Sequence, residues 1–252
     1  MDGHVAAGHG SAPLLSPTPA TVTGPTGDPG REPFSARLRR LANPVWRAQH
    51  EHPFVRGIGN GSLDLPRFRH WVRQDYRFLV EYCRLFGLAA ARAPDLDTLV
   101  RFADLLQTTA RTEMDLHRAY AAELGIAPVA LEREPMAPTT RAYTDFLVRV
   151  AATGDFAELA AALLPCMWGF AEIGQALAAR GLPAEPRYAQ WIRMYADPEF
   201  AALAGWCREL VDRLAAGTDG ATRGRMEEAF LISSRYEYLF WEMAWSLETW
   251  PV

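Results

Sequence analysis

The sequence predicts an all-α protein: a multi-helix bundle that forms a single domain. From Phe34 onward, apolar residues recur at spacings of three and four almost without pause, which is typical of amphipathic helices. No segment shows the alternation of apolar and polar residues, bounded by turns, that predicts a strand. Residues that cap or end helices, such as Asp64, Gly125 and Asp155, separate the periodic stretches. We therefore expect about seven or eight helices and essentially no sheet.

The first 31 residues differ in composition from the rest of the chain. They are rich in Pro, Gly, Ser and Thr and offer few side chains to bury, so residues 1–31 are predicted to form a disordered tail. Residues 32–252 are predicted to form the helical domain, which is an ordinary size for one domain.

In the first half of the domain we expect a helix over 34–49, followed by a connection that carries three glycines over 50–63. The next helix is capped by Asp64 and continues past Phe86 along an apolar stripe. A third helix is expected over 95–124, and a loop that contains prolines follows it to Pro138.

In the second half, boundary residues divide the chain into five further helices. Asp155 and Asp219 have the side chains that cap helices, and Pro198 suits a first turn. The expected ranges are 139–154, 155–180, 186–195, 197–216 and 219–249.

Composition excludes several classes of protein. Hydrophobic residues make up 49% and charged residues 22% of the chain, the net charge is −4, and no basic stripe predicts nucleic-acid binding. Charged residues interrupt the apolar runs, so we expect no membrane-spanning helix. All 26 basic residues are arginine, which rules out a Schiff-base lysine and a P-loop lysine.

Cysteine usage favours a reducing compartment. Cys83, Cys166 and Cys207 are widely spaced, without a CxxC pair or a disulfide framework. The N-terminus lacks the basic and apolar regions of a signal peptide, so we expect a cytoplasmic protein.

Two carboxylates interrupt apolar helical stripes. Asp75 lies in register with Trp71 and Leu79, and Glu237 lies among the aromatic residues of the last helix. A buried carboxylate is costly unless it is paired, hydrogen-bonded or needed for chemistry. Each could be a structural acid held by an arginine or, for Asp75, by helix-end amides. Alternatively, Asp75 binds a protonated or hydrogen-bonding ligand, and Glu237, with a pKa raised by burial, acts as a general acid or base.

Cys166 lies on an apolar stripe directly after Pro165, in the run ALLPCMWGFAEIG. A lone buried cysteine is commonly inert core. Pro165, however, leaves the carbonyl of Ala161 without its helical donor, and such interruptions often border pockets. Composition leaves both interpretations open.

Glu113 and His117 form an ExxxH pair one helical turn apart. A metal site would need further ligands, and the chain after His117 contains no histidine. A structural hydrogen bond is therefore favoured for this pair, with a haem-oxygenase-like di-iron oxidase as an alternative.

Four motifs together resemble a known family. They are HPFVRGIGNGSLDLPRFRHWVRQDYRFL, ALLPCMW, QWIRMYADPEF and SSRYEYLFWEMAW, in this order, and they look like the TenA family (thiaminase II, aminopyrimidine aminohydrolase) over residues 34–250. The resemblance implies a haem-oxygenase-like fold, a homotetramer without haem or metal, and an aminopyrimidine or thiamin substrate.

The resemblance also implies roles for individual residues. Cys166 matches the nucleophile that adds to the pyrimidine ring, and Glu237 matches the acid/base that moves protons to the leaving group and from water. Asp75 matches the acid that anchors a ring nitrogen and the amino group. Tyr143 and Tyr195 match aromatic residues around the ring.

Two positions depart from the commonest family pattern. Phe78 and Phe170 stand where many members carry tyrosine, so the pocket loses two hydroxyl groups. The hydroxyl at 170 would help to orient Glu237, so its loss predicts weaker or shifted activity.

The leading hypothesis is a cofactor-free hydrolase of thiamin salvage, which converts 4-amino-5-aminomethyl-2-methylpyrimidine to the hydroxymethyl compound and possesses a cysteine nucleophile. Cleavage of thiamin itself is a related activity. The alternative is a non-catalytic protein on the same fold that binds pyrimidine or thiamin, or regulates. It would bind a pyrimidine without releasing ammonia.

Overall fold

The computed structural model describes residues 32–252, so the predicted tail over residues 1–31 lies outside the described residues. Within residues 32–252 the chain forms twelve α-helices and one π-helical turn, without a strand. The all-α prediction is confirmed.

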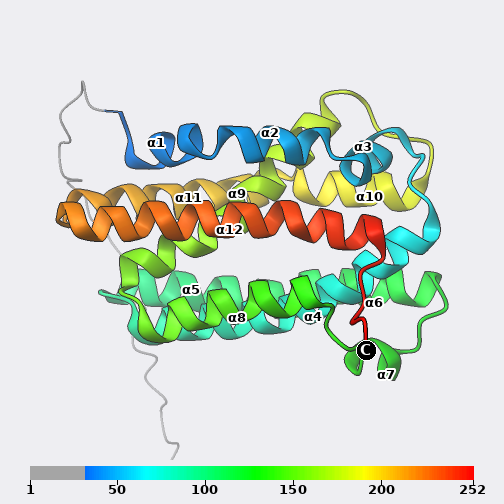
Figure 1. Cartoon of the computed structure of the whole chain (residues 1–252), viewed down its shortest axis with the longest axis horizontal. Coiled ribbons are helices and arrows are strands. Elements are labelled where there is room, and N and C mark those ends of the chain that lie inside the picture. The colour runs from blue at the N-terminus through cyan, green and yellow to red at the C-terminus, as the bar shows by residue number, and fades with distance from the viewer. Residues whose placement is uncertain (1–31) are drawn as a thin grey trace, which may run out of the picture. The chain divides into compact units, whose positions relative to one another are not determined.

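The helices of this unit lie in three rows (Figure 1). One outer row holds α1 (Phe34–Leu41), α2 (Asn43–Glu51) and α3 (Pro53–Asn60), and the central row holds α10 (Pro186–Tyr195), α11 (Pro198–Ala216) and α12 (Gly220–Ser246). The other outer row holds α4 (Leu65–Arg92), α5 (Leu96–Thr108), α6 (Met114–Glu123) and α8 (Pro138–Thr153). Helix α9 (Phe156–Ala178) runs obliquely across the three rows. Helix α9 packs against α8, α10, α11 and α12. It therefore runs through the middle of the core.

The predicted connection over 50–63 contains a helix, α3, that the sequence interpretation missed. His52 caps this helix by accepting the amide of Phe54, and Pro53 occupies its first turn. Its apolar face, which includes Phe54 and Ile58, is fully buried. The glycines of this segment favour a loop, but the burial of its apolar face outweighs their low helix propensity.

Other boundaries also differ from the predicted ranges. The helix expected over 34–49 is divided at Ala42, where Pro44 removes an amide donor from the helical ladder. The helix expected over 95–124 contains the π-helical turn η1 (Thr109–Glu113), which separates α5 from α6.

The last two differences lie in a loop and at the C-terminal helix. The predicted loop before α8 holds the short helix α7 (Pro128–Glu132). Helix α12 ends at Ser246 because Leu247 takes a left-handed conformation with φ 56°.

Aspartates cap five helices, which confirms the caps predicted at Asp64 and Asp155. Each accepts a backbone amide of its helix's first turn: Asp64 for α4, Asp95 for α5, Asp155 for α9, Asp197 for α11 and Asp219 for α12.

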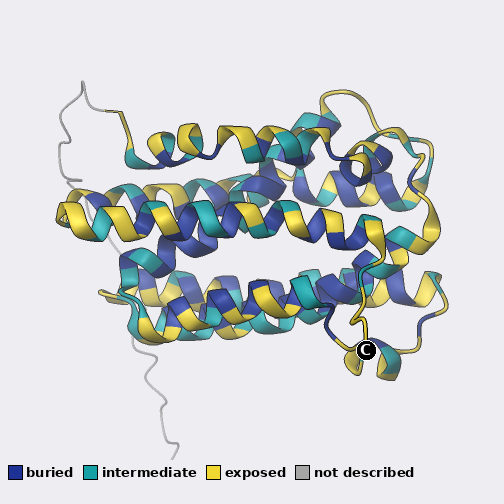
Figure 2. Ribbon diagram, viewed as in Figure 1, coloured by how far each residue is buried: buried dark blue, intermediate teal, exposed yellow. Residues whose placement is uncertain are grey.

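Helix α9 is long and apolar enough to span a membrane by length and composition, although Glu158 and Glu172 interrupt its apolar run. In its most apolar window 72% of the residues are buried inside the bundle. Figure 2 shows the same burial along α9. The apolar composition is accounted for by its place in the core.

Candidate active site

A small cavity lies where α4, α9, α10 and α11 meet the π-helical turn. Its volume is about 20 Å³, enough for little more than one water molecule. Six residues that the sequence singled out form part of its wall: Asp75, Phe78, Glu113, Cys166, Phe170 and Tyr195. Leu79, Tyr82, Met167 and Phe200 complete the wall. We call this space the inner cavity.

Glu237 on α12 joins this group from behind Cys166. Its carboxylate is buried and accepts hydrogen bonds from the Tyr143 hydroxyl, at 2.5 Å, and from the Cys166 thiol. Burial and the charge of Asp75 raise the pKa of Glu237 to about 8, although the two hydrogen bonds pull it down. At neutral pH most of this carboxyl group is therefore protonated, and it can exchange a proton near pH 8.

Tyr143 has a different place from the one that the resemblance implied. Its hydroxyl lies 2.8 Å from the Ser233 hydroxyl as well as 2.5 Å from Glu237, and its ring packs 5.1 Å from Phe78. Tyr143 therefore orients Glu237 directly. This orientation does not depend on a hydroxyl at Phe170, whose loss the sequence interpretation treated as the weak point.

The Cys166 thiol is held in its protonated form. Burial raises the pKa of this thiol, and the charges of Glu237, Asp75 and Glu113 raise it further, whereas a hydrogen bond with Tyr82 lowers it. The Tyr82 hydroxyl also bonds the carbonyl of Leu163, 2.9 Å away, on the turn that precedes Cys166. Attack by the sulfur therefore needs a base to take the thiol proton, and Glu237 is in contact with it.

His117 on α6 is the partner of Asp75, and the sequence interpretation missed this pairing. Its Nε2 lies 2.6 Å from Asp75 Oδ2, and its Nδ1 lies 2.9 Å from the backbone carbonyl oxygen of Glu113. Burial lowers the pKa of His117, but the bond and charge of Asp75 outweigh it, and the net shift is upward. The predicted acid is thus held by a histidine rather than by an arginine or helix-end amides. The pairing joins residues of two helices that lie far apart in the sequence, so the sequence carried no signal for it.

The structural hydrogen bond predicted for Glu113 and His117 is confirmed, and it joins His117 Nδ1 to the backbone carbonyl of Glu113. The carboxylate instead accepts a hydrogen bond from the Thr109 hydroxyl at 3.1 Å, across the π-helical turn. Burial and the charge of Asp75 raise the pKa of Glu113 to about 7, although the charge of His117 lowers it. π-Helical turns are frequent at functional sites, and this one places a carboxylate in the wall of the inner cavity.

A second, larger space adjoins the inner cavity and has a volume of about 280 Å³. Glu113, Met167 and Phe200 belong to the walls of both spaces, so these three side chains form the partition between them. The remaining wall comes from the end of α5, the π-helical turn, the end of α10 and the start of α11. We call this space the outer cavity.

Close packing fixes Tyr195 in the inner cavity. A Cβ atom at Gly174 on α9 would lie 2.5 Å from the Tyr195 carbonyl carbon, so only glycine allows α10 to approach α9 this closely. The Tyr195 ring packs 4.8 Å from Phe170 and 4.6 Å from Trp191. The cavity wall around Phe170 is therefore a rigid aromatic cluster.

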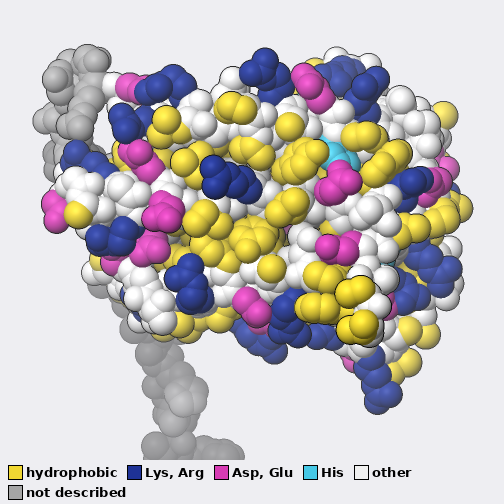
Figure 3. Space-filling view, in the orientation of Figure 1, with side chains coloured by type: hydrophobic (Ala, Val, Ile, Leu, Met, Phe, Trp, Pro, Cys, Tyr) yellow, Lys and Arg dark blue, Asp and Glu magenta, His cyan; other side chains and the backbone are white. Residues whose placement is uncertain are grey.

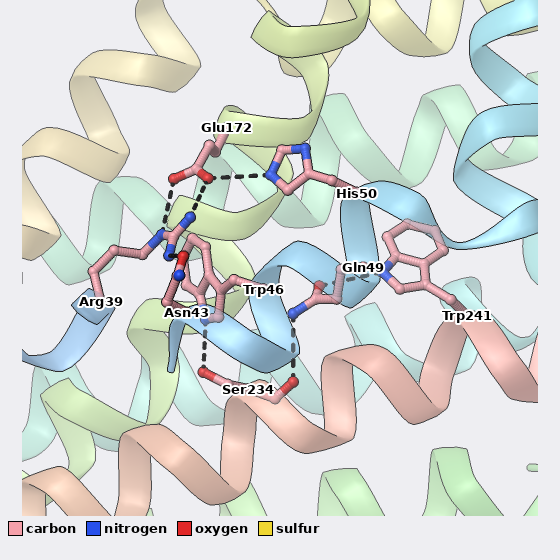
Figure 4. A network of polar contacts seen from close by, with 8 residues as sticks. All are labelled: Arg39, Asn43, Trp46, Gln49, His50, Glu172, Ser234 and Trp241. Carbon is pink, nitrogen blue, oxygen red and sulfur yellow. Dashed lines mark hydrogen bonds and ion pairs between the residues drawn. The ribbon is translucent and has the colours of Figure 1, made fainter. Parts of the chain in front are cut away.

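A polar network links α2 to the two helices that carry Cys166 and Glu237 (Figure 4). Glu172 on α9 binds Arg39 at 2.7 Å and His50 at 3.1 Å. On α12, the hydroxyl of Ser234 accepts the Trp46 indole N–H, and its carbonyl accepts the Gln49 amide. Gln49 also accepts the Trp241 indole N–H, at 3.3 Å. The network ties both helices to α2 close to the site.

No group of three or more His, Cys, Asp or Glu side chains within residues 32–252 is arranged to hold a metal ion. Glu113 and His117 accordingly offer the di-iron alternative no ligand set in this part of the chain.

Known proteins share both the sequence and the fold. Residues 39–247 match the TENA/THI-4/PQQC family. An aminopyrimidine aminohydrolase of Halalkalibacterium halodurans is 43% identical over 86% of this chain and 97% of its own length; one from Bacillus subtilis is 38% identical over 86% and 92%. The structure of a TenA homologue from P. horikoshii superposes with a TM-score of 0.78 at 28% identity, over 85% of this chain and 99% of that one. A Shewanella denitrificans domain with a heme oxygenase-like fold, 13% identical over 84% of this chain and 91% of that one, superposes with a TM-score of 0.66 and shares the fold.

Proposed function

Because the chain belongs to the TENA/THI-4/PQQC family, we propose that it is a hydrolase of aminopyrimidines that acts in thiamin salvage, with Cys166 as its nucleophile. Its reaction converts 4-amino-5-aminomethyl-2-methylpyrimidine and water to the hydroxymethyl compound and ammonia. The observation that carries the proposal is that Asp75 and Cys166, from two helices, line one cavity, and that Glu237, from a third helix, lies against the Cys166 thiol.

Asp75 and its partner His117 bind and polarise the ring. The Asp75 carboxylate faces the inner cavity and is fixed from behind by His117. It accepts hydrogen bonds from the amino group and from a protonated ring nitrogen, and a carboxylate favours the protonated form of that nitrogen. A protonated pyrimidine is a better electrophile, which prepares the ring for addition.

Cys166 then adds to the ring. Its sulfur forms a bond to a ring carbon while the thiol proton passes to the Glu237 carboxylate, with which it is in hydrogen-bond contact. The bond between the exocyclic methylene carbon and nitrogen then breaks, and its electron pair leaves with the nitrogen. Glu237 passes the proton it took from the thiol to that nitrogen, so the leaving group departs as the amine or its ammonium ion and Glu237 is a carboxylate again.

Water completes the cycle. It adds to the exocyclic methylene carbon and gives a proton to Glu237, and the ring expels the Cys166 sulfur, which regains a proton. The Tyr143 hydroxyl holds the Glu237 carboxylate in position throughout. No atoms other than those of substrate and water are consumed, so the cycle needs no oxidant or cofactor.

The experiment is an ammonia-release assay with the aminomethyl pyrimidine, carried out on the wild type, Cys166→Ala and Glu237→Gln. We expect turnover by the wild type and loss in both variants. Cys207→Ala is the matched control, because Cys207 is a buried thiol on α11 that lines neither cavity. Unchanged rates in Cys166→Ala would contradict the nucleophile. Pyrimidine binding without ammonia release would instead support the non-catalytic alternative.

The assembly that we propose with this function is a homotetramer in the cytoplasm. Apolar side chains gather on one face of the helical unit (Figure 3), and Leu239, Leu247 and Trp250 are exposed large hydrophobic residues of α12 and the segment after it. Exposed apolar residues of this kind favour association with further copies. Light scattering should give about four times the chain mass of 28.0 kDa. A mass of one chain would contradict the tetramer.

A further inference from the structure

The inner cavity is too small to hold both halves of a substrate. Its free volume is about 20 Å³, and its wall consists largely of packed aromatic rings. A pyrimidine that enters it must displace the partition side chains, and the group attached to the exocyclic methylene then needs separate space. The outer cavity is the adjoining space, because Glu113, Met167 and Phe200 line both.

The outer cavity has a definite chemical character. Three of its wall residues are acidic, Glu113, Asp197 and Glu199, and none is arginine or histidine. The Asp197 carboxylate is engaged in capping α11 and Glu199 is exposed to solvent. Glu113 is the carboxylate that also lines the inner cavity, whose wall includes Cys166.

The rest of the outer wall suits an organic group of moderate size. Leu105, Met194 and Leu203 provide apolar surface, and three threonines of the π-helical region provide hydroxyl groups. A volume of about 280 Å³ leaves room for an amine or for a five-membered heterocycle with its side chain.

We propose that the outer cavity is the subsite for the group displaced from the pyrimidine and that Glu113 selects leaving groups that carry a positive charge. This assignment rests on the proposed function and specifies its substrate class: cationic amines and thiazolium are preferred to neutral amides. The carboxylate stabilises the cation through space while Cys166 reacts in the inner cavity. The pKa of Glu113, about 7, lets it ionise beside a bound cation at neutral pH.

The test compares three substrates that share one pyrimidine. The aminomethyl compound is protonated at neutral pH, as primary amines are, thiamin carries a permanent thiazolium charge, and the formylaminomethyl compound is neutral. In Glu113→Gln we expect kcat/KM to fall about tenfold for the two cations and less than twofold for the formyl compound. Gln keeps the side-chain shape and can still accept the hydrogen bond from Thr109, so the π-helical turn is preserved.

Matched variants separate this local effect from a change in net charge or a failure to fold. Glu123→Gln removes an exposed charge of α6 outside both cavities and should leave the ratio of cationic to neutral substrates unchanged. Thr108→Lys adds a cation to the outer wall at an exposed position, and it should lower the same ratio independently.

Two results would overturn the assignment. An equal loss on all three substrates in Glu113→Gln, or no change on any, would show that Glu113 does not select the leaving group. A wild type that turns over none of the three substrates would overturn the proposed function itself. If the wild type is active but Glu113→Gln leaves the ratio of cationic to neutral substrates unchanged, only the subsite assignment is overturned.

Discussion

Two glutamates on packed neighbouring helices, Glu172 of α9 and Glu237 of α12, hold protons very differently. The pKa of Glu172 is lowered to about 2, and that of Glu237 is raised to about 8. Burial raises both. At Glu172 the bonds and charges of His50 and Arg39 outweigh burial, whereas Glu237 meets only neutral donors and the charge of Asp75.

The difference separates a structural acid from a reactive one. Glu172 belongs to the network in Figure 4, whose members come from α1, α2, α9 and α12. Such a network stabilises position and leaves no proton to exchange near neutral pH. Glu237 lacks a basic partner and so keeps a proton that can move. The pairing of each carboxylate, more than its depth, decides which of the two can act as a general base.

The largest effect that we expect is on catalysis. Glu237→Gln removes the base, and the ammonia-release rate should fall by roughly 10²–10⁴-fold, the usual contribution of a positioned acid/base. Its control is Glu242→Gln, which changes an exposed glutamate of the same helix that bonds His52. Equal rates in the wild type and Glu237→Gln would show that Glu237 is not the general base.

A loss of stability should follow from Glu172→Gln. The change weakens the charged hydrogen bonds to Arg39 and His50 and should cost about 2 kcal/mol at pH 7, measured by urea unfolding. Because the pKa of Glu172 lies below its ordinary value of 4.5, its contribution is complete above pH 4.5 and is lost as the pH falls toward 2. A cost that persists unchanged at pH 2 would contradict this account.

Glu237→Gln should increase stability at high pH, whereas Glu172→Gln decreases it. The raised pKa of Glu237 means that the wild type loses stability as the pH rises from 4.5 through about 8, while glutamine does not titrate. A shift from 4.5 to about 8 corresponds to about 5 kcal/mol, so relative to wild type the variant should gain several kcal/mol between these two pH values. Unfolding curves at both ends of the range check it, and a parallel pH dependence in the two proteins would refute it.

A smaller effect is expected from Tyr143→Phe, which removes the hydroxyl that donates to Glu237. Since this hydrogen bond lowers the pKa of Glu237, its loss should raise that pKa and move the ascending limb of the kcat/KM profile to higher pH. Activity at neutral pH should fall about fivefold, which corresponds to about 1 kcal/mol. An unmoved profile would show that Tyr143 does not tune Glu237.

Much of the fold could be predicted from sequence, because the signals were local. Capping aspartates such as Asp64 and the apolar periodicity of α4 place helices directly. The π-helical turn and α3 could not be placed in this way. The π-helical turn lies within a continuous periodic pattern that does not reveal it. Helix α3 forms because Phe54 and Ile58 are buried in the folded protein, which outweighs the glycine-rich sequence around them.

The site was predictable in part, for the same reason. Asp75, Cys166 and Glu237 each stand out as polar residues on apolar helices, and the structure brings them together. Their partners depend on tertiary contacts between residues far apart in the chain. His117 meets Asp75 from another helix, and Tyr143 meets Glu237 from 94 residues away, so no spacing rule could have assigned them.

The most direct test of the contrast between the two glutamates is a carboxyl ¹³C NMR titration of the protein labelled at glutamate side chains. Loss of a resonance in Glu237→Gln and in Glu172→Gln assigns the two signals. We predict that the Glu237 signal titrates with a midpoint near pH 8, and that the Glu172 signal shows an ionised carboxylate at every pH above about 3. A Glu237 midpoint below pH 5 would contradict its assignment as the proton-exchanging base beside Cys166.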